Sequence, residues 1–561
     1  MFKENDVFFD NVSPNYKSFG TKKIKFKDKN DLIEISNKEK EVSFAKKSNF
    51  LFFLVTVSFF SFIFISLLKV SYFNNKNTFY NEKKVVQKRG KILDRNGEII
   101  ATSLETKDLY VDTRKTLDEK RLKMQLMKIF DEKGHKFFDK IFAKKQYSLI
   151  KTDLSPSDLN ELKKIGDPGI KFHSSKKRIY PQHNIFSHLT GFMTSNLKSK
   201  IEKNLNSKLS KGENILLTVD LRIQNIVRDE LLNSLKDYDA KSALSIVMNV
   251  KNGEILSMVS LPDFNPNYPA SILPQTENNL VTEARYEMGS TLKIFNAAIA
   301  FENESAIQEK EFDISGGYQI TNKKKISDDH IKLKKLSFDQ VFTRSSNVGS
   351  VKILESVGLG LQEKFFEKVG LTKNIALEGL NIVSNKLPNN WDSHSKFISY
   401  GYGISISPIS MVSAFSSLVN GGFKIQPKIY KQKNRSAKER ILSAKTSNKI
   451  NKLITKAIHQ GTGKRAYVEG ISIGGKTGTS KKVEMGNYSE EKVITSFVGV
   501  FPAKDPEHLT FVLFDEPKKN INGLSENTGG NTAAPTFSKI VKKIAPIINE
   551  DNYLRNLDRW I

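Results

Sequence analysis

The feature that most constrains this chain is an uninterrupted apolar segment near its N-terminus. From Phe50 to Leu68 the sequence reads FLFFLVTVSFFSFIFISLL, without a single charge, with Lys46 and Lys47 before it and Lys69 after it. A helix of about this length spans the roughly 30 Å hydrocarbon core of a bilayer. The sequence therefore predicts a transmembrane helix over residues 50–69.

The competing interpretation of this segment is a cleaved signal peptide. However, residues 1–49 precede it, and no small-x-small cleavage site follows in Lys69-Val-Ser-Tyr-Phe. We therefore expect an uncleaved signal anchor with a tail over residues 1–49. Lys and Arg number four in 35–49 and four in 69–84, so the positive-inside rule does not settle the orientation. No later stretch reaches about 18 apolar residues, which places everything after Leu68 on one side of the membrane.

Composition excludes several classes of function. The 561 residues are 38% hydrophobic and 27% charged, as in folded chains of more than one domain. The formal charge of +28 is spread along the chain without a basic, aromatic-rich stripe, so no nucleic-acid partner is predicted. The absence of Cys excludes disulfides and thiolate ligands. The 8 His form no His-x-x-x-His or His-Glu-x-x-His pair of the kind that a zinc hydrolase uses, so metal chemistry is not expected.

After the apolar segment the chain changes character near residue 212. Residues 70–212 mix a short strand, 109–111, with a Lys-rich, helix-like stretch over 118–146, and contain no catalytic set. This region predicts a non-catalytic spacer or docking domain. From 213 to 561 strands and apolar helices follow, which predicts an α+β domain with an antiparallel sheet covered by helices. The expected elements are a strand over 215–219, a helix over 221–235, and a hairpin of strands 243–248 and 255–259 joined through Asn252-Gly253.

The candidate nucleophile lies within this second region. Ser290-Thr291-Leu292-Lys293 follows Gly289 and opens the apolar run 294–301, which predicts a buried helix beginning near the serine. Residues three apart on a helix are neighbours, so the amine of Lys293 can reach the hydroxyl of Ser290, as a base must reach its nucleophile.

Ser-x-x-Lys is a weak signal by itself in a chain this rich in lysine. It recurs at Ser43/Lys46, Ser66/Lys69, Ser148/Lys151, Ser174/Lys177, Ser195/Lys198 and Ser393/Lys396. What distinguishes Ser290 is that Ser345-Ser346-Asn347 follows it, and that Lys476-Thr477-Gly478, the only Lys-Thr-Gly in the chain, comes later still. Ser-x-Asn also occurs at 13–15 and 525–527, where a turn or cap is the ordinary interpretation. The apolar segment 496–500 predicts a strand beside Lys476.

These three motifs in this order resemble the penicillin-binding proteins and class A β-lactamases. The surrounding residues are similar to class B penicillin-binding proteins over roughly residues 50–540. The similar segments are 285–293, 401–405, 461–463, 474–479 and 529–535, with 89–97 and 178–181 resembling the motifs of that family's pedestal. Within this family, segments 261–267 and 401–405 look more like the enzyme of cell division than the enzyme of cell elongation. The elongation enzyme remains the alternative.

The resemblance implies a fold and a reaction. The fold is a penicillin-binding transpeptidase domain on an elongated α+β pedestal with one transmembrane helix. The reaction is peptidoglycan D,D-transpeptidation at the division septum: Ser290 attacks the penultimate D-alanine of a stem peptide, and an amine of a neighbouring strand resolves the acyl-serine. The implied location is the inner membrane, single-pass, with the catalytic domain in the periplasm.

The resemblance also implies a role for each site residue. Lys293 acts as the base and must be neutral near pH 7, which requires burial or nearby cations such as Lys476. Ser345 relays protons and Asn347 holds the substrate and the lysine. Lys476-Thr477-Gly478-Thr479 binds the substrate, with Lys476, Thr477 and Thr479 on its terminal carboxylate, and the N–H groups of Ser290 and Thr479 form the oxyanion hole.

Partners follow in the same way. Stem peptides are the substrates, β-lactams are covalent inhibitors, and a membrane glycosyltransferase and other division proteins are the expected partners. The resemblance also implies no metal and no cofactor. The chain is short between Gly191 and Leu216 compared with many relatives, so the resemblance does not by itself transfer the contacts that the family's pedestal makes.

Two other classes of function stay open. One is a β-lactam sensor or non-catalytic division scaffold, and the other is a D,D-carboxypeptidase or β-lactamase, although no deacylating glutamate is evident. We interpret His183, His188, His330, His394 and His459 as surface or structural, and Asp263 and Asn267 as turn residues.

Overall fold

The computed structural model describes residues 50–69, 88–194, 196–304, 306–322, 324–328, 330–431, 439–518 and 527–557. The chain divides into two units, Met1–Val86 and Gln87–Ile561. In the first, the apolar segment forms the helix Phe50–Lys69, the one helix among the described residues that is long and apolar enough to cross a membrane. Its side chains are exposed, as lipid-facing side chains would be. The predicted helix is confirmed, whereas the tail over 1–49 lies outside the described residues.

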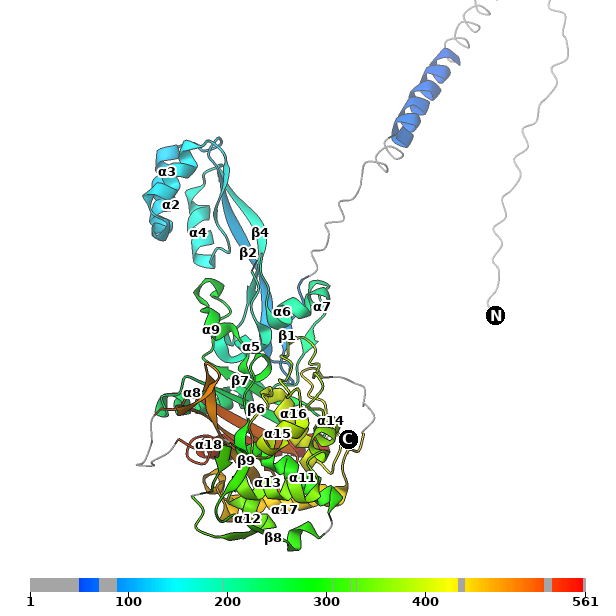
Figure 1. Ribbon diagram of the computed structural model, residues 1–561. Coiled ribbons are helices and arrows are strands. Elements are labelled where there is room, and N and C mark those ends of the chain that lie inside the picture. The colour runs from blue at the N-terminus through cyan, green and yellow to red at the C-terminus, as the bar shows by residue number, and fades with distance from the viewer. Residues whose placement is uncertain are drawn as a thin grey trace, which may run out of the picture. The chain divides into compact units, whose positions relative to one another are not determined.

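The second unit is built around a five-stranded antiparallel sheet of order β12-β13-β14-β6-β7 (Figure 1). The predicted hairpin is β6 with β7, and the strand predicted beside Lys476 is β13, paired with β12. Both predictions are confirmed. The strands are β6 Ser242–Asn249, β7 Ile255–Leu261, β12 Gly474–Glu484, β13 Asn487–Phe501 and β14 His508–Asp515.

Helices cover both faces of this sheet, which explains why its central strands are apolar throughout. Alternate residues of β14 point to opposite faces: Phe511 belongs to one core and Val512 to the other. One face packs against α8 Leu221–Asp237 and α18 Ala533–Leu557. Helix α8 begins at the Asp220 cap, whose carboxylate accepts from the backbone N–H of Arg222, and it confirms the helix predicted over 221–235.

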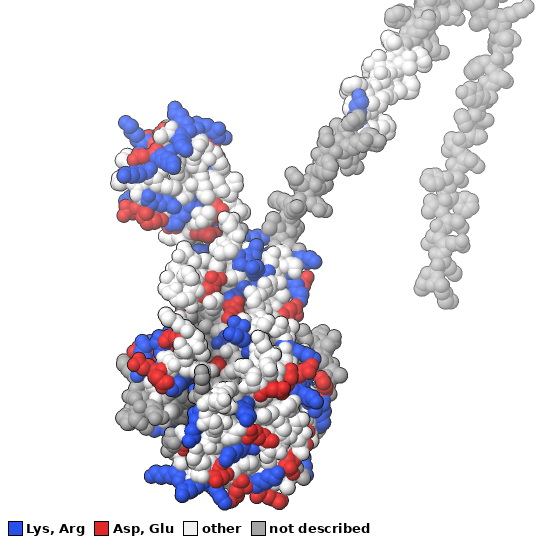
Figure 2. Space-filling view, viewed as in Figure 1, with Lys and Arg blue, Asp and Glu red and all other residues white. Residues whose placement is uncertain are grey.

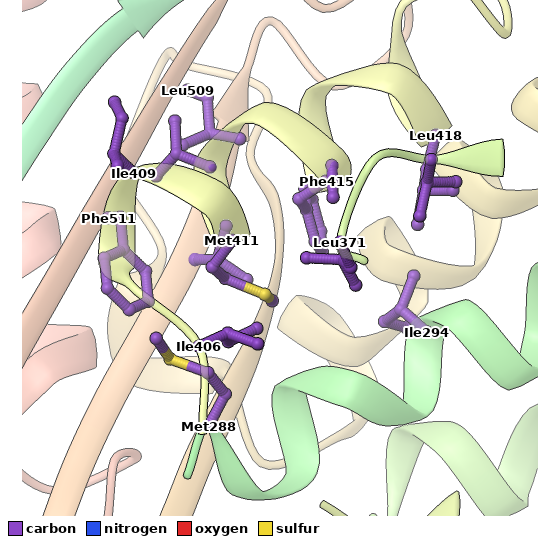
Figure 3. Close-up of a cluster of buried hydrophobic side chains, with 14 of the residues drawn as sticks. Met288, Ile294, Leu371, Ile406, Ile409, Met411, Phe415, Leu418, Leu509 and Phe511 are labelled. Carbon is purple, nitrogen blue, oxygen red and sulfur yellow. The ribbon is translucent and has the colours of Figure 1, made fainter. Parts of the chain in front are cut away.

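The other face carries the helices next to the first two candidate motifs, at Ser290 and Ser345. Helix α16, Pro408–Val419, packs over β14 and reaches Met288 just before the nucleophile turn (Figure 3). The central helix α11, Lys293–Asn303, is buried from Lys293 to Phe301, as its continuous apolar sequence predicts. The remaining helices of this domain are α9 Pro274–Glu277, α10 Leu280–Glu283, α12 Phe338–Thr343, α13 Asn347–Val357, α14 Leu361–Lys368, α15 Trp391–Ser399 and α17 Ala444–Gln460. Two small antiparallel pairs join β8 Glu311–Asp313 to β11 Lys335–Ser337 and β9 Tyr318–Thr321 to β10 Lys324–Ile326.

The pedestal is organised by one long antiparallel pair, β2 with β4 (Figure 1). At its far end three helices and β3 enclose a separate small core around Phe130 and Phe138. On the face drawn in Figure 2, Lys and Arg side chains gather over this end, as its Lys-rich sequence predicts. The helix-like stretch predicted over 118–146 is two helices, because the chain turns through Gly134 at φ +71°. The elements are β1 Ile92–Leu93, β2 Ile99–Asp112, α2 Glu119–Ile129, α3 His135–Ala143, β3 Tyr147–Lys151, α4 Pro156–Ile165, β4 Ile170–Ile179, α5 Ser187–Thr190, α6 Lys200–Asn204 and α7 Asn206–Ser210.

The pedestal and the catalytic domain share backbone and side-chain contacts where they meet. The predicted strand over 215–219 is only β5, Ile215–Leu216, and it pairs in parallel with β1 of the pedestal. Asn267 exchanges hydrogen bonds with both backbone groups of Tyr180. Asp263 pairs with Arg228 and accepts from Asn184. Asp263 and Asn267 therefore connect the two parts and do more than form a turn. The boundary at 212/213 stays a prediction, and one sheet runs across it.

Candidate active site

The candidate nucleophile lies on a tight turn between the sheet and the central helix. Residues Gly289–Leu292 form a 3-10 helix that leads directly into α11. Residues three apart in a 3-10 helix eclipse one another, so Ser290 and Lys293 lie on the same side. Gly289 has φ +55°, and a Cβ there would lie 2.4 Å from the carbonyl oxygen of Thr479. Glycine thus lets the nucleophile turn approach β12 at backbone distance.

Lys293 is wholly buried and its amine is held by the second motif. Its Nζ donates to the carbonyl oxygen of Ser345 at 2.6 Å and to Oδ1 of Asn347 at 2.7 Å, and lies 3.3 Å from Oγ of Ser345. Burial lowers the pKa of Lys293 to about 7, although the carboxylate of Asp328 acts in the opposite direction. A neutral amine is therefore accessible near neutral pH. The structure shows no hydrogen bond between Lys293 and the Ser290 hydroxyl, both of which lie in its described part, so that contact stays a prediction.

The second motif occupies the junction of α12 and α13. Ser345 adopts φ +61°, a left-handed conformation that is uncommon for serine and that turns the chain between the two helices. Ser346 caps α13, accepting from the N–H of Gly349 at 2.8 Å.

A buried carboxylate beneath this junction holds the motif in place. Asp328 accepts from the hydroxyl of Ser346 and from the N–H groups of Asn347 at 2.7 Å and Val348 at 3.1 Å. It therefore binds the N-terminus of α13, where unpaired N–H groups favour negative charge. Sequence analysis missed Asp328, because an aspartate in a polar loop well before Ser345 has no distinguishing pattern.

The third motif lies on β12, across the turn from Ser290. Lys476 is wholly buried, and its Nζ donates to Oγ of Ser345 at 3.0 Å and to the carbonyl oxygen of Thr477 at 3.1 Å. Burial and the charge of Lys293 lower the pKa of Lys476. Ser345 Oγ thus lies between the two amines. Close packing requires Gly478, where a Cβ would lie 2.4 Å from Oγ of Ser496 and 2.7 Å from the carbonyl oxygen of Met288.

A cavity of about 440 Å³ opens above these groups. Ser290, Ser345 and Thr479 are among its lining residues, while Lys293 and Lys476 are buried beneath. Thr477 Oγ1 lies 2.7 Å from Oγ1 of Thr462, and Oγ1 of Thr479 accepts from the N–H of Gly529 at 3.0 Å. The other lining residues are His330, Arg344, Asn347, Tyr400, Tyr402, Thr462, Thr477, Thr528, Gly530 and Asn531.

A second buried carboxyl supports the tyrosines of the cavity wall. Glu287 Oε1 accepts from the N–H of Gly403 at 2.8 Å and from the hydroxyl of Tyr488 at 3.1 Å. Burial raises the pKa of Glu287. The Tyr402 ring stacks edge to face on Tyr488 at 5.2 Å, and Tyr400 lies next to Tyr402. Glu287 thereby links the residues before the nucleophile turn to the wall that includes Tyr400 and Tyr402.

The structure brings the predicted residues together and separates them from other copies of the motifs. Ser290, Lys293, Ser345, Asn347, Lys476, Thr477, Gly478 and Thr479 all lie in or directly beneath this cavity. In contrast, the amine of Lys396 pairs with Glu355, and Ser393 bonds within its own helix. The predicted triplet 13–15 and Ser525 lie outside the described residues. Of the histidines, His188 is buried and structural, with Nε2 bonded to the carbonyl oxygen of Thr276, whereas exposed His330 lines the cavity.

Comparisons with known proteins identify the family of both parts of the chain. Residues 243–542 match the family described as penicillin binding protein transpeptidase domain, and residues 84–215 match the penicillin-binding protein dimerisation domain. A Caulobacter vibrioides protein named probable peptidoglycan D,D-transpeptidase FtsI is 31% identical over 80% of this chain and 79% of its own. Stage V sporulation protein D of Bacillus subtilis is 28% identical over 80% of this chain and 76% of its own. A Neisseria meningitidis protein named probable peptidoglycan D,D-transpeptidase PenA is 26% identical over 71% of this chain and 73% of its own.

Proposed function

Because this chain belongs to the class B penicillin-binding proteins, we propose that it is a peptidoglycan D,D-transpeptidase that forms its acyl-enzyme on Ser290. The observation that supports this most directly is the convergence of Ser290, Ser345 and the two buried lysines on one cavity. These groups come from three motifs separated by long stretches of chain, and the cavity is where a single peptide carbonyl could meet all of them.

In the proposed acylation, the neutral amine of Lys293 receives the proton of the Ser290 hydroxyl as the oxygen attacks the penultimate D-alanine carbonyl. The N–H groups of Ser290 and Thr479 stabilise the developing oxyanion, where one donor is typically worth about 3 to 4 kcal/mol of barrier. The position of Ser345 Oγ, 3.3 Å from one amine and 3.0 Å from the other, suits a relay that protonates the departing D-alanine. The C–N bond breaks, and the acyl group stays on Ser290.

The terminal carboxylate of the substrate is assigned to the third motif. Thr477 and Thr479 line the same wall, and Lys476 lies beneath it, where burial and the charge of Lys293 lower the pKa of its amine. A bound carboxylate would favour the charged amine, because an opposite charge nearby raises the pKa of an amine. Substrate binding would thus leave Lys476 charged and Lys293 neutral, the combination that the reaction needs.

The second half of the reaction transfers the acyl group to an amine of another stem peptide. None of the described residues that line the cavity is acidic, so this part of the wall offers no carboxylate to activate water. This supports transfer to an amine over hydrolysis, and hence a transpeptidase over a carboxypeptidase or β-lactamase.

The cellular setting follows from the relatives and from the anchor. The name of the Caulobacter relative supports action in division, although the Bacillus relative is named for sporulation and elongation remains the alternative. Among the described residues, Phe50–Lys69 is the one helix long and apolar enough to cross a membrane, which supports a single-pass membrane protein. We propose that residues 1–49 are cytoplasmic, that the catalytic domain is periplasmic, and that a membrane glycosyltransferase and division proteins are its partners.

The decisive experiment is mass spectrometry of the full-length protein after reaction with a penicillin. We expect one acyl adduct, on Ser290, and none in Ser290→Ala. Ser393→Ala is the matched control, since Ser393 and Lys396 form the same motif away from the cavity. A folded wild-type protein that never acquires the adduct, or that acquires it on another residue, contradicts the proposal.

Two further measurements separate the alternatives. If cells whose only copy of this protein is the Ser290→Ala variant still divide, the protein acts as a sensor or scaffold. Products formed from lipid-linked substrate distinguish cross-linked dimers, expected here, from the trimmed monomers of a carboxypeptidase.

A further inference from the structure

The described wall of the active-site cavity is cationic without a balancing carboxylate. Its lining residues include Arg344 and His330 and no described Asp or Glu. Two basic side chains therefore lie at two depths, with Lys476 wholly buried at the base and the exposed Arg344 at the rim. In the proposed function, the terminal carboxylate of the donor peptide pairs with Lys476. No group of the substrate has yet been assigned to pair with the guanidinium of Arg344.

The position of Arg344 is set by the same local structure that places the relay serine. Arg344 is the C-cap of helix α12, where its N–H donates to the carbonyl oxygen of Gln340 at 2.9 Å, and Ser345 follows it directly. The next turn is anchored by Asp328, so the backbone of Arg344 is held on both sides. The guanidinium has no ion pair or side-chain hydrogen bond within the part of the chain that the structure describes.

We propose that Arg344 is a specificity-determining residue that binds a second carboxylate of the donor peptide, distinct from its terminal one. A guanidinium presents paired N–H donors that match a carboxylate in two parallel hydrogen bonds. The preferred donor is thus a peptide with a free carboxylate near the scissile D-alanine pair. This inference rests on the function proposed above and adds a substrate class to it.

The test uses two synthetic peptides that both end in D-Ala-D-Ala. One has a free carboxylate on the preceding residue, and the other has that carboxylate amidated. The measurement is the second-order rate of Ser290 acylation by each peptide, followed by mass spectrometry on the full-length protein. The wild type should prefer the free carboxylate by about tenfold, the scale of one charge-assisted pair of roughly 1.4 kcal/mol. The preference should weaken at high ionic strength, because the rim is exposed to solvent.

Variants locate the preference. Arg344→Gln should bring the two rates together, Arg344→Lys should retain part of the difference, and Arg344→Glu should reverse it. Arg465→Gln is the matched control, because Arg465 is an exposed arginine that does not line the cavity. Labelling of Ser290 by a fluorescent penicillin in each variant shows that the nucleophile is folded and reactive.

The outcomes distinguish this inference from the proposed function. Equal rates for both peptides in a wild type that penicillin labels would overturn the role of Arg344 and leave the enzyme assignment intact. An equal loss for both peptides in Arg344→Gln would show that Arg344 binds the terminal carboxylate, which also overturns the inference. The inference would also be overturned if the free carboxylate were preferred only when the peptides serve as acceptors. Failure of penicillin to label Ser290 would instead contradict the proposed function.

Discussion

At the scale of single residues, the site contains two buried lysines, and the buried carboxylate of Asp328 lies near one of them. Lys293 and Lys476 are both fully buried, and burial lowers the pKa of each. Asp328 is the buried carboxylate that partly opposes this for Lys293, while its hydrogen bonds hold the Ser345 junction. One carboxylate therefore influences both the geometry and the protonation of the proposed base.

The pH dependence of acylation should reveal this arrangement. Because the base must be neutral, acylation by penicillin should rise with pH through about 7 and level off above it. In Asp328→Asn the midpoint should move to lower pH, since removing a negative charge lowers the pKa of Lys293 further. The plateau rate should fall about tenfold because a charged hydrogen-bond acceptor is lost, typically about 1.5 to 3 kcal/mol. Stopped-flow labelling between acidic and basic pH measures both quantities.

Asp313→Asn is the matched control, because Asp313 is exposed on β8 and its carboxylate accepts from the neighbouring Ser315. A pH midpoint that stays in place in Asp328→Asn would show that Asp328 has no electrostatic influence on the base.

At the scale of elements, the cleft exists because the nucleophile turn and β12 approach each other without side chains between them. Gly289 and Gly478 face each other across this contact, and a Cβ at either would overlap backbone atoms of the other segment. The approach places the N–H of Thr479 beside the turn that presents Ser290. If this N–H belongs to the oxyanion hole as proposed, its position relative to Ser290 must be kept closely.

Gly478→Ala should therefore damage both stability and acylation. The added methyl would meet Oγ of Ser496 at 2.4 Å and the carbonyl oxygen of Met288 at 2.7 Å. Overpacking of this kind typically costs about 1 to 3 kcal/mol, and β12 must move away from Ser290 to relieve it. Thermal unfolding and the rate of penicillin labelling measure the two effects. Gly360→Ala, at a position with nothing within 4 Å of the built Cβ, should change neither. Normal labelling in Gly478→Ala would mean that the contact is not needed for catalysis.

At the scale of the whole molecule, buried charged side chains hold together the base of the pedestal, from which one ion pair reaches the catalytic domain. Glu202 is fully buried and pairs with Arg178 through one oxygen and with Arg89 through the other. Arg178 also donates to the carbonyl oxygen of Gly90. Close by, Lys200 pairs with Glu283, which ends the short helix α10 before the nucleophile turn. These contacts connect the base of the pedestal to the segment that leads into that turn.

Removing Glu202 should thus destabilise the base of the pedestal strongly. Glu202→Ala leaves two arginines without their carboxylate in a buried site, a change that typically costs about 3 to 5 kcal/mol. Chemical denaturation of the detergent-solubilised protein should show a lower midpoint, or an early transition in which the pedestal unfolds. Glu378→Ala, which removes the exposed partner of Lys208 in the same region, should have a much smaller effect. Similar losses in the two variants would show that burial of the cluster is unimportant.

Several features follow from sequence alone because their signals are local. The apolar run 50–68, the Asn252-Gly253 hairpin and the helix after Asp220 each depend on residues that are close together in the chain, and all three form as expected. The motif trio around Ser290, Ser345 and Lys476 and the family also follow from sequence, since their order and surroundings are specific even though each motif alone is not. The main local error was the Lys-rich stretch over 118–146, where Gly134 separates two helices.

Only the tertiary structure decided which distant side chains support the site. Glu287 meets Tyr488 across 201 residues, and Lys476 meets Ser345 across 131. Asp328 and Arg344 acquire their positions from the packing of α12 and α13, which no local pattern encodes. Burial also sets the protonation of Lys293, because the pKa of a lysine depends on the solvent that the surrounding fold excludes. Sequence determined which groups this protein could use, and packing determined which of them meet, because contacts across long separations depend on the fold as a whole.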